Sequence, residues 1–276
     1  MKLIQMADEV RYPRMTTAEL RDTFLVEELF EPDRVQLAYV DLDRTVIGSA
    51  VPLGSALLLP CPELLRADSF TERRELGIFN IGGPGGVDVD GVSYPLGKRD
   101  ALYVGRGQHD ISFTSNDRSA PAEFYLLGYP AHAGYPTALV LASDSPPLAL
   151  GATATVNRRK IRKLIHLDSV KSCQLVMGFT DLEEGSAWNT MPPHTHMRRS
   201  EVYLYFDLPA DHRVVHLMGP PKETRHLLVA NKQVVISPGW SIHAGVGTSN
   251  YSFCWGMGGE NQIYTDMDAL QVADLR

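Results

Sequence analysis

Short segments rich in β-branched and aromatic residues fill most of the chain after residue 35. They include VQLAYVDLD (35–43), LGIFNIGG (76–83), EFYLLGYP (123–130), EVYLYFDL (201–208) and HLLVANKQVVISPG (226–239). Clusters of Gly, Pro, Asp and Asn separate them, which is typical of strands joined by turns. The sequence therefore predicts an all-β fold of the sandwich or barrel type.

One helix is expected before the first of these strands. TTAELRDTFLVEELF (16–30) places Thr16 three residues before Glu19, followed by apolar residues at helical spacing. That arrangement is the capping box that begins many helices. We therefore expect one short helix here and few elsewhere.

The chain is predicted to form two domains, residues 1–150 and 151–276. The segment 142–157, ASDSPPLALGATATVN, is rich in prolines and small residues and is typical of a linker. Residues 100–116 also align with residues 234–250, so that His109 meets His243 and the triplet TSN ends both segments. This weak internal repeat suggests two copies of one β unit.

Composition limits the classes of partner. The net charge is −7 and the arginines are scattered, so nucleic acid is not expected to bind. The longest apolar stretches are broken by prolines, and no membrane association is expected. Three widely spaced cysteines suit reduced thiols rather than a disulfide framework, so we expect a cytoplasmic protein.

A group of possible metal ligands occurs in PPHTHMRRSEVYLYF (192–206). In a strand, His194 and His196 project from the same face. Glu201 follows five residues later, an odd offset that requires a bend within residues 197–200. His243 follows a Pro-Gly turn in PGWSIH (238–243). Three imidazoles and one carboxylate suit Zn, Fe, Mn, Co or Ni, with positions left open for water or substrate.

These segments resemble the two motifs of the cupins, H-x-H with three or four residues before Glu, and P-x-G-x-x-H. The second motif departs from the pattern, because Trp240 stands where glycine is usual. Longer runs, among them CQLVMGFTDLEEGSAWNTMPPHTHMRRSEVYLYF and WGMGGENQIYTDMD, resemble the 5-keto-4-deoxyuronate isomerases. The resemblance extends over most of the chain. It implies a bicupin in which His194, His196, Glu201 and His243 bind one zinc ion per chain, and a homo-oligomer, a hexamer.

The first half of the chain departs from the cupin pattern. Counting back from Glu75, the H-x-H positions are Asp68 and Phe70, and phenylalanine has no atom to offer a metal. We therefore expect no metal site in that half. His109 is expected to be a lone structural or pocket histidine.

The resemblance also implies a reaction, in which an open-chain 5-keto-4-deoxyuronate, an aldehyde, becomes a 2,5-diketone during pectin and uronate breakdown. This shift needs an electrophile and at least one proton carrier. Glu201, Tyr264 and Glu260 are the candidate catalytic residues. The substrate carboxylate needs a cation, and the candidates are Arg162, Lys171, Arg199 and Arg225.

Three other functions fit the same ligand types. A 5-deoxyglucuronate isomerase of inositol breakdown would share the chemistry and differ in substrate. An iron-dependent cupin dioxygenase would need redox cycling and oxygen. A non-catalytic sugar-binding or storage cupin would need neither an open coordination position nor a proton carrier.

Overall fold

The chain, described over residues 1–276 in a computed structural model, divides into two units that exchange segments. Unit 1 comprises Met1–Ile4, Glu28–Pro146 and Lys163–Met177, and unit 2 comprises Gln5–Glu27, Pro147–Arg162 and Gly178–Arg276. The predicted division at residue 150 differs from these bounds. It assigns residues 5–27 to the first half of the chain, whereas they belong to unit 2, and residues 163–177 to the second half, whereas they belong to unit 1.

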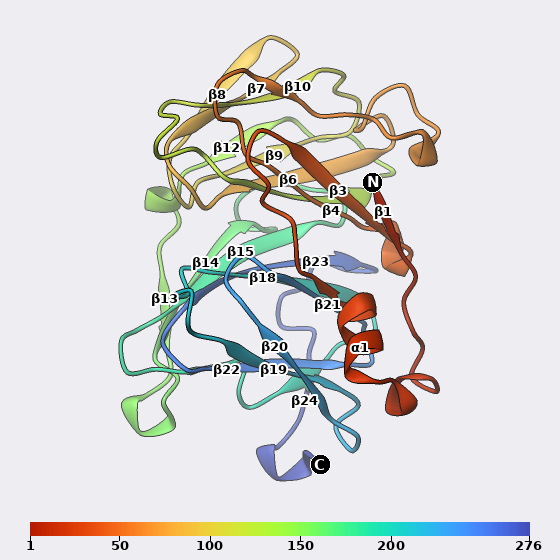
Figure 1. Cartoon of the computed structure of the whole chain (residues 1–276), viewed down its shortest axis with the longest axis vertical. Helices are drawn as coiled ribbons and strands as arrows, with labels where there is room; N and C mark the ends of the chain where they lie inside the picture. The colour runs from red at the N-terminus through yellow and green to blue at the C-terminus, as the bar shows by residue number, and fades with distance from the viewer. The chain divides into compact units, whose positions relative to one another are not determined.

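Unit 1 is built from two sheets, most of whose strands are labelled in Figure 1. The seven-stranded sheet has the order β1 (Lys2–Ile4), β3 (Val35–Val40), β4 (Val46–Ala50), β11 (Phe124–Pro130), β6 (Arg74–Asn80), β9 (Ala101–Val104) and β12 (Ala138–Val140). The four-stranded sheet has the order β5 (Leu57–Leu58), β10 (Ile111–Ser115), β7 (Gly85–Val89) and β8 (Val92–Leu96). Aliphatic and phenylalanine side chains from both sheets form one buried core.

Unit 2 repeats this plan. Its seven-stranded sheet has the order β13 (Leu148–Leu150), β14 (Arg159–Ile165), β15 (Val176–Leu182), β23 (Ser252–Gly259), β18 (Arg199–Phe206), β21 (Val234–Ser237) and β2 (Leu25–Val26). Its four-stranded sheet has the order β16 (Trp188–Asn189), β22 (Ile242–Gly247), β19 (Val214–Gly219) and β20 (Arg225–Val229). A short ribbon pairs β17 (His194–Thr195) with β24 (Asp268–Ala269).

The two strand orders correspond position by position. In each seven-stranded sheet the fifth strand, β6 or β18, carries a buried glutamate, Glu75 or Glu201. The second strand of the four-stranded sheet is β10 in unit 1 and β22 in unit 2. His109 lies just before β10, and His243 lies within β22. The prediction of a mostly β chain with an internal repeat therefore agrees with the observed topology.

The predicted helix is present but ends early. Thr16 and Glu19 form the capping box, and α1 spans Thr17–Phe24. Leu25 and Val26 then pair with β21 as strand β2, because hydrogen bonding to an open sheet edge outweighs the helical pattern of residues 25–30. The predicted linker 142–157 likewise contains a strand, β13, which pairs with β14.

The remaining helical segments are single turns. They are η1 (Tyr12–Arg14), η2 (Leu42–Arg44), η3 (Glu63–Leu65), η4 (Ala142–Asp144), η5 (Thr153–Thr155) and η6 (Val272–Asp274). None of the helices has the length and apolar character needed to cross a membrane.

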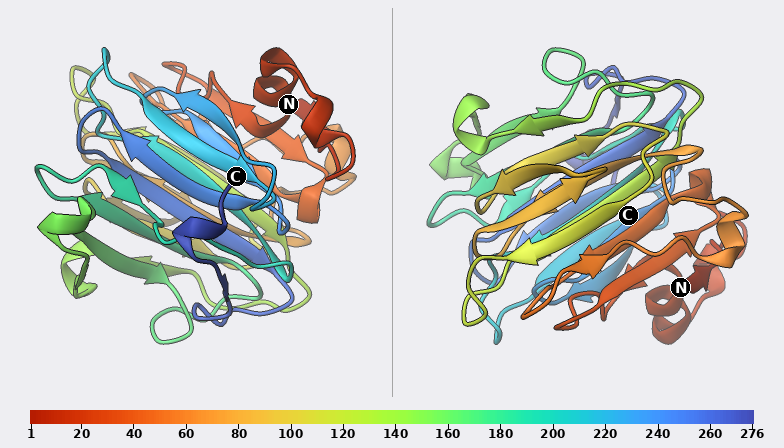
Figure 2. Two further views of the ribbon diagram at one scale, coloured as in Figure 1. Left: turned by 90° about the horizontal axis from the view of Figure 1, so that it is seen from below. Right: turned by 90° about the horizontal axis from the view of Figure 1, so that it is seen from above.

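Both chain ends of unit 2 are fastened to its strands. The segment that contains α1 lies beside β20 and β21 (Figure 1), and the Tyr12 hydroxyl donates to the Met218 carbonyl at 2.9 Å. Trp240 packs edge-on against Tyr12 and Phe24, so the residue that departs from the cupin motif anchors this segment. At the other end, Arg276 exchanges hydrogen bonds with the turn between β19 and β20, where Figure 2 places the C-terminus.

Candidate metal centre and its pocket

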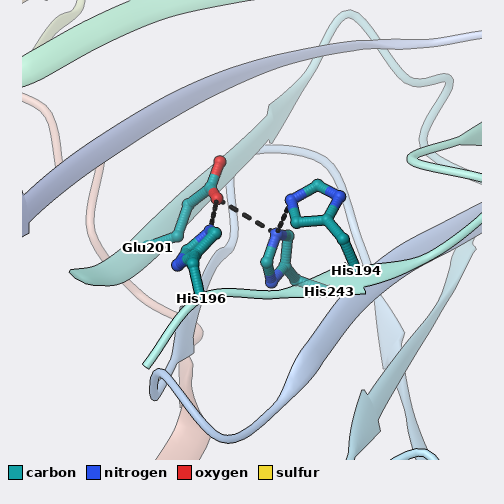
Figure 3. Close-up of side chains that lie close together, drawn as sticks. All are labelled: His194, His196, Glu201 and His243. Atoms are coloured by element: carbon teal, nitrogen blue, oxygen red, sulfur yellow. Dashed lines mark hydrogen bonds and ion pairs between the residues drawn. The ribbon is translucent and has the colours of Figure 1, made fainter. Parts of the chain in front are cut away.

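Four side chains that could bind a metal ion converge in unit 2 (Figure 3). His194 lies in β17, His196 follows that strand, Glu201 lies in β18 and His243 lies in β22. One potential ligand atom from each lies within 4.8 Å of the other three. His196, Glu201 and His243 are buried, and His194 is partly exposed. The cluster is thus closed on one side and accessible at His194.

A turn between β17 and β18 brings His196 and Glu201 together. Strand β17 ends at Thr195, and β18 begins at Arg199. Between them the Arg199 N–H donates to the His196 carbonyl at 3.1 Å. This turn lets two residues with an odd offset face the same point. Gly239 permits the close packing, because a Cβ there would lie 2.9 Å from Met197 Cα.

The spacing of the ligand atoms suits a small divalent ion. His196 Nε2 and His243 Nε2 lie 2.9 and 3.1 Å from Glu201 Oε2, and His243 Nε2 lies 3.0 Å from His194 Nε2. Metal–ligand bonds of about 2.1 Å place neighbouring donor atoms about 3.0 Å apart at right angles and about 3.4 Å apart in a tetrahedron. Three imidazoles and one carboxylate are also ligand types that first-row metals accept. The residues therefore fit a bound metal ion.

Hydrogen bonds fix the orientation of one ligand ring. His196 Nδ1 donates to the Arg199 carbonyl at 2.9 Å, which leaves the Nε2 lone pair facing the cluster when the ring is neutral. His243 Nδ1 lies farther from its neighbours, 3.4 Å from both Ser237 Oγ and the Ser241 carbonyl. The backbone of the β17–β18 turn therefore selects the tautomer in which His196 can bind a metal.

The electrostatics of the cluster differ from one member to the next. Burial, with the neighbouring His243, lowers the pKa of His194 to about 3, so this imidazole is neutral at pH 7. Burial alone would raise the pKa of Glu201, but His243 and hydrogen bonds from both buried histidines hold it well below its usual value. Burial alone would lower the pKa of His196, but the hydrogen bond and the charge of Glu201 raise it above its usual value. The neutral imidazole of His194 and the ionised carboxylate of Glu201 are the forms that bind cations.

A pocket of about 240 Å³ opens beside His194. Alternate residues of β14 and β23 line it, because the side chains of a strand point to the same face every second residue. Arg159 and Ile161 come from β14, Tyr203 from β18, and Phe253 and Trp255 from β23. The rest of the lining is Leu150, Thr180, Thr190, Pro192, His194, Tyr264 and Met267. The pocket is therefore mostly apolar, with a few polar groups near the candidate ligand His194.

The loop that carries Tyr264 is held by two arginines. Arg199 is buried, and its Nη atoms donate to the carbonyls of Ile263 and Asp266 at 2.9 Å. Arg198 forms a two-bond pair with the Asp266 carboxylate, at 2.8 and 2.9 Å. The Tyr264 ring packs against Trp255 with centroids 5.2 Å apart, and burial raises the pKa of its hydroxyl to about 12. Tyr264 therefore faces the pocket as a protonated phenol.

The structure brings some predicted site residues to the pocket and places others elsewhere. Glu260 is exposed and is not part of the pocket lining, and Lys171 is exposed in unit 1. Arg225 donates to the carbonyls of Pro13 and Met15 at 3.2 and 2.8 Å, so it fastens the N-terminal segment. Arg162 also lies outside the lining, and Arg199 supports the loop from behind.

The cation that does line the pocket, Arg159, was missed at the level of sequence. It lies three residues from the predicted Arg162 in the run RRKIRK (158–163). An odd offset places these two side chains on opposite faces of β14, and Ile161 shares the face of Arg159. Strand periodicity could have reduced the choice to one of the two faces, but only the fold shows which face borders the pocket.

The equivalent region of unit 1 has a structural role. Phe70 packs in the core of unit 1. Glu75 is fully buried and accepts hydrogen bonds from the N–H groups of residues 173–175, at 2.6, 2.8 and 2.7 Å, and from the Tyr103 hydroxyl at 2.8 Å. His109 is exposed and precedes β10. The donors around Glu75 are fixed groups of the protein itself.

The fold and the site together define a class, a cupin-like β protein with a three-histidine, one-glutamate cluster able to hold a metal ion. Residues 38–272 match the KduI/IolB family. The chain belongs to that family.

Relatives of the chain carry one recurrent name. This chain is 54% identical over 263 residues to the 4-deoxy-L-threo-5-hexosulose-uronate ketol-isomerase of Halalkalibacterium halodurans, with 95% of each chain covered. It is 49% identical over 278 residues to the protein of the same name from Opitutus terrae, with both chains fully covered. Among solved structures, an IolB-like protein from Salmonella typhimurium LT2 is similar at a TM-score of 0.72. That match covers 90% of this chain and 97% of the other at 14% identity, so it supports the fold alone.

Proposed function

We propose that this chain is a metal-dependent aldose–ketose isomerase. It converts 5-dehydro-4-deoxy-D-glucuronate, also named 4-deoxy-L-threo-5-hexosulose uronate, into 3-deoxy-D-glycero-2,5-hexodiulosonate during the breakdown of pectin uronates. The observation that carries this proposal is a cluster of three histidines and one glutamate that could hold a metal ion and borders a pocket at His194, in a chain about half identical to isomerases of that name.

The ion proposed for the site is zinc, one per chain, held by His194, His196, Glu201 and His243. The donor set supports this choice, since zinc accepts both imidazole and carboxylate ligands. When bound, a divalent ion supplies Lewis-acid polarisation of the substrate's carbonyl group. Zinc has no redox chemistry, which suits an isomerisation in which no electrons are exchanged with a cofactor.

The reaction transfers hydrogen within the substrate. A proton leaves C2, negative charge develops on the carbonyl oxygen at C1, and that oxygen takes up a proton. A proton is then added at C1 as the C2 hydroxyl loses its proton and becomes the carbonyl. A protonated group near the developing charge stabilises it, and a proton carrier is needed at the carbon atoms.

Tyr264 is the proposed proton carrier that donates a proton to the substrate. Its hydroxyl belongs to the same pocket as His194, and its pKa of about 12, raised by burial and by the Glu201 charge, keeps the proton in place at pH 7. Glu201 acts as a ligand, because its low pKa makes it a weak base. Glu260, also predicted as a carrier, has an exposed position that gives this role no support.

The wider assignments extend the same proposal. Two units with corresponding sheets support the description as a bicupin. The hexamer and the cytoplasmic location remain predictions from the sequence.

The proposal is tested by incubating protein of known metal content, without oxygen, with the open-chain uronate. We expect the diketone to form, chelation to stop its formation, and zinc to restore it. Running the reaction in heavy water and recording NMR spectra should show deuterium at C1. Protein that holds a full complement of metal and leaves the uronate unchanged would refute the proposed function.

A further inference from the structure

Arg159 is the cation best placed to interact with a ligand in the pocket of unit 2. No acidic side chain belongs to the lining, and the other lining residues are apolar, hydroxyl-bearing or aromatic apart from the candidate metal ligand His194. A pocket with one guanidinium and no carboxylate of its own complements an anion.

The guanidinium is held by one edge and free at the other. Its Nη1 donates to the Asn157 carbonyl at 3.0 Å, while Nε and Nη2 make no hydrogen bond within the chain. Nε and Nη2 form the side edge of the guanidinium, which matches the two oxygens of a carboxylate. Burial lowers the pKa of Arg159, but an arginine remains charged at any physiological pH.

The other arginines of unit 2 near the site are already engaged or face elsewhere. Both Nη atoms of Arg199 donate to backbone carbonyls. In Arg198, Nε pairs with Asp266 and Nη2 pairs with Asp268. Arg162 projects from the opposite face of β14. Arg159 therefore stands alone as a cation in the pocket.

From these contacts we infer that Arg159 binds the substrate's carboxylate and makes the pocket selective for acids over neutral sugars. This inference rests on the proposed function, because it places the reacting carbons at the metal cluster and the carboxylate at the other end of the molecule. A pocket of about 240 Å³ lies just below the 300–1,000 Å³ range common for drug-sized ligands, which suits a six-carbon chain.

The test compares the uronate with its methyl ester, which has the same carbon skeleton and no charge. In wild-type protein we expect kcat/KM to be about 10- to 100-fold higher for the acid, the range expected for a charge-assisted two-bond contact. Arg159→Gln should remove most of this preference by raising KM for the acid. The methyl ester should be processed almost as before, because the lost contact is remote from the reacting carbons.

Arg158→Gln provides a matched control. Arg158 is the preceding residue, pairs with Glu183 at 2.8 Å on the surface and is not part of the pocket lining. Its loss should leave the preference for the acid unchanged. Arg159→Lys keeps the charge without the fork and should fall between wild type and Arg159→Gln, which also provides a second variant should the glutamine protein fold poorly.

Two results would overturn the inference. In one, Arg159→Gln retains the wild-type preference for the acid; in the other, it lowers kcat/KM equally for both compounds. If wild-type protein turns over neither compound, the proposed function fails, and calorimetric binding of the acid and the ester then tests Arg159 separately. Preferential binding of the acid that Arg159→Gln removes would support the inference, and equal binding of both would refute it.

Discussion

Glu75 in unit 1 and Glu201 in unit 2 occupy corresponding strands and are both buried, yet their partners differ. Glu75 receives three backbone N–H groups and one tyrosine hydroxyl, all of them donors that the fold holds in place. Glu201 contacts two imidazoles, those of His196 and His243, both through the single oxygen Oε2. A carboxylate saturated by fixed donors stabilises the fold, whereas one shared between imidazoles has the surroundings of a cation ligand.

The side chains between the two sheets also differ in polarity, being apolar in unit 1 and partly polar in unit 2. The third residue of β7 in unit 1 is Val87, part of an aliphatic core, while the third residue of β19 in unit 2 is His216. His216 Nδ1 lies 2.7 Å from the Tyr205 hydroxyl, and Asn189 donates to the Tyr251 hydroxyl at 2.7 Å. Two similar topologies therefore enclose an apolar core in one case and a polar network next to the candidate metal ligands in the other.

The largest expected effect comes from removing the imidazoles that unit 1 lacks. His194→Ala combined with His196→Ala should reduce bound metal from one ion per chain to none, and turnover by about 1,000-fold or more, because two ligands are lost. Elemental analysis and initial rates measure this. His109→Ala, at the aligned position of unit 1, should change neither; a metal content that survives the double substitution would remove the basis of the comparison.

Next in size is the effect of Tyr264→Phe, which tests whether the chemistry of unit 2 extends beyond its ligands. The ring packing against Trp255 should persist without the hydroxyl, so metal content and thermal stability should stay close to wild type. Loss of a proton carrier should lower kcat by about 100- to 1,000-fold. Steady-state kinetics on metal-loaded protein would detect it, and a wild-type kcat would exclude the hydroxyl from the reaction.

The two glutamates can then be compared directly in their effects on stability. Glu75→Gln leaves backbone donors of residues 173–175 with a poorer acceptor and should lower the free energy of unfolding by about 2 kcal/mol, with metal content unchanged. Glu201→Gln should weaken metal binding and leave the metal-free protein much less affected. Chemical denaturation with metal analysis separates the two. The comparison fails if both substitutions act mainly on stability or both mainly on metal.

The smallest expected effect concerns pH. Burial lowers the pKa of His216 to about 3 in the folded chain, below its value of about 6.5 when unfolded. Between these values the unfolded chain binds a proton that the folded chain does not, so stability is complete above pH 6.5 and falls as pH decreases, by up to about 1.4 kcal/mol per pH unit.

His216→Gln keeps a polar partner for the Tyr205 hydroxyl and cannot take up that proton. Its unfolding free energy should therefore vary less between pH 6.5 and pH 5 than that of wild type, as measured by denaturant titrations at each pH. Parallel curves for the two proteins would show that this imidazole titrates alike in the folded and unfolded chains.

Much of the fold follows from local sequence patterns. Turn-separated, β-branched segments predicted a mostly β chain, and the Thr16–Glu19 capping box predicted the start of α1. The early end of that helix could not be predicted, because Leu25 and Val26 pair with β21 more than 200 residues away. The exchange of residues 5–27 and 163–177 between the units depends on the same kind of distant pairing.

The sequence by itself determined which residues could form the metal cluster, because His194, His196 and Glu201 are close in the chain and His243 follows a recognisable turn. Tertiary structure decided which other groups belong to the pocket. Arg159 rather than Arg162 faces it, and Tyr264 rather than Glu260 lines it. The physical reason is that the direction of a side chain depends on strand register and loop anchoring, and here these are set by the neighbouring strands and by the two arginines that hold residues 263–266.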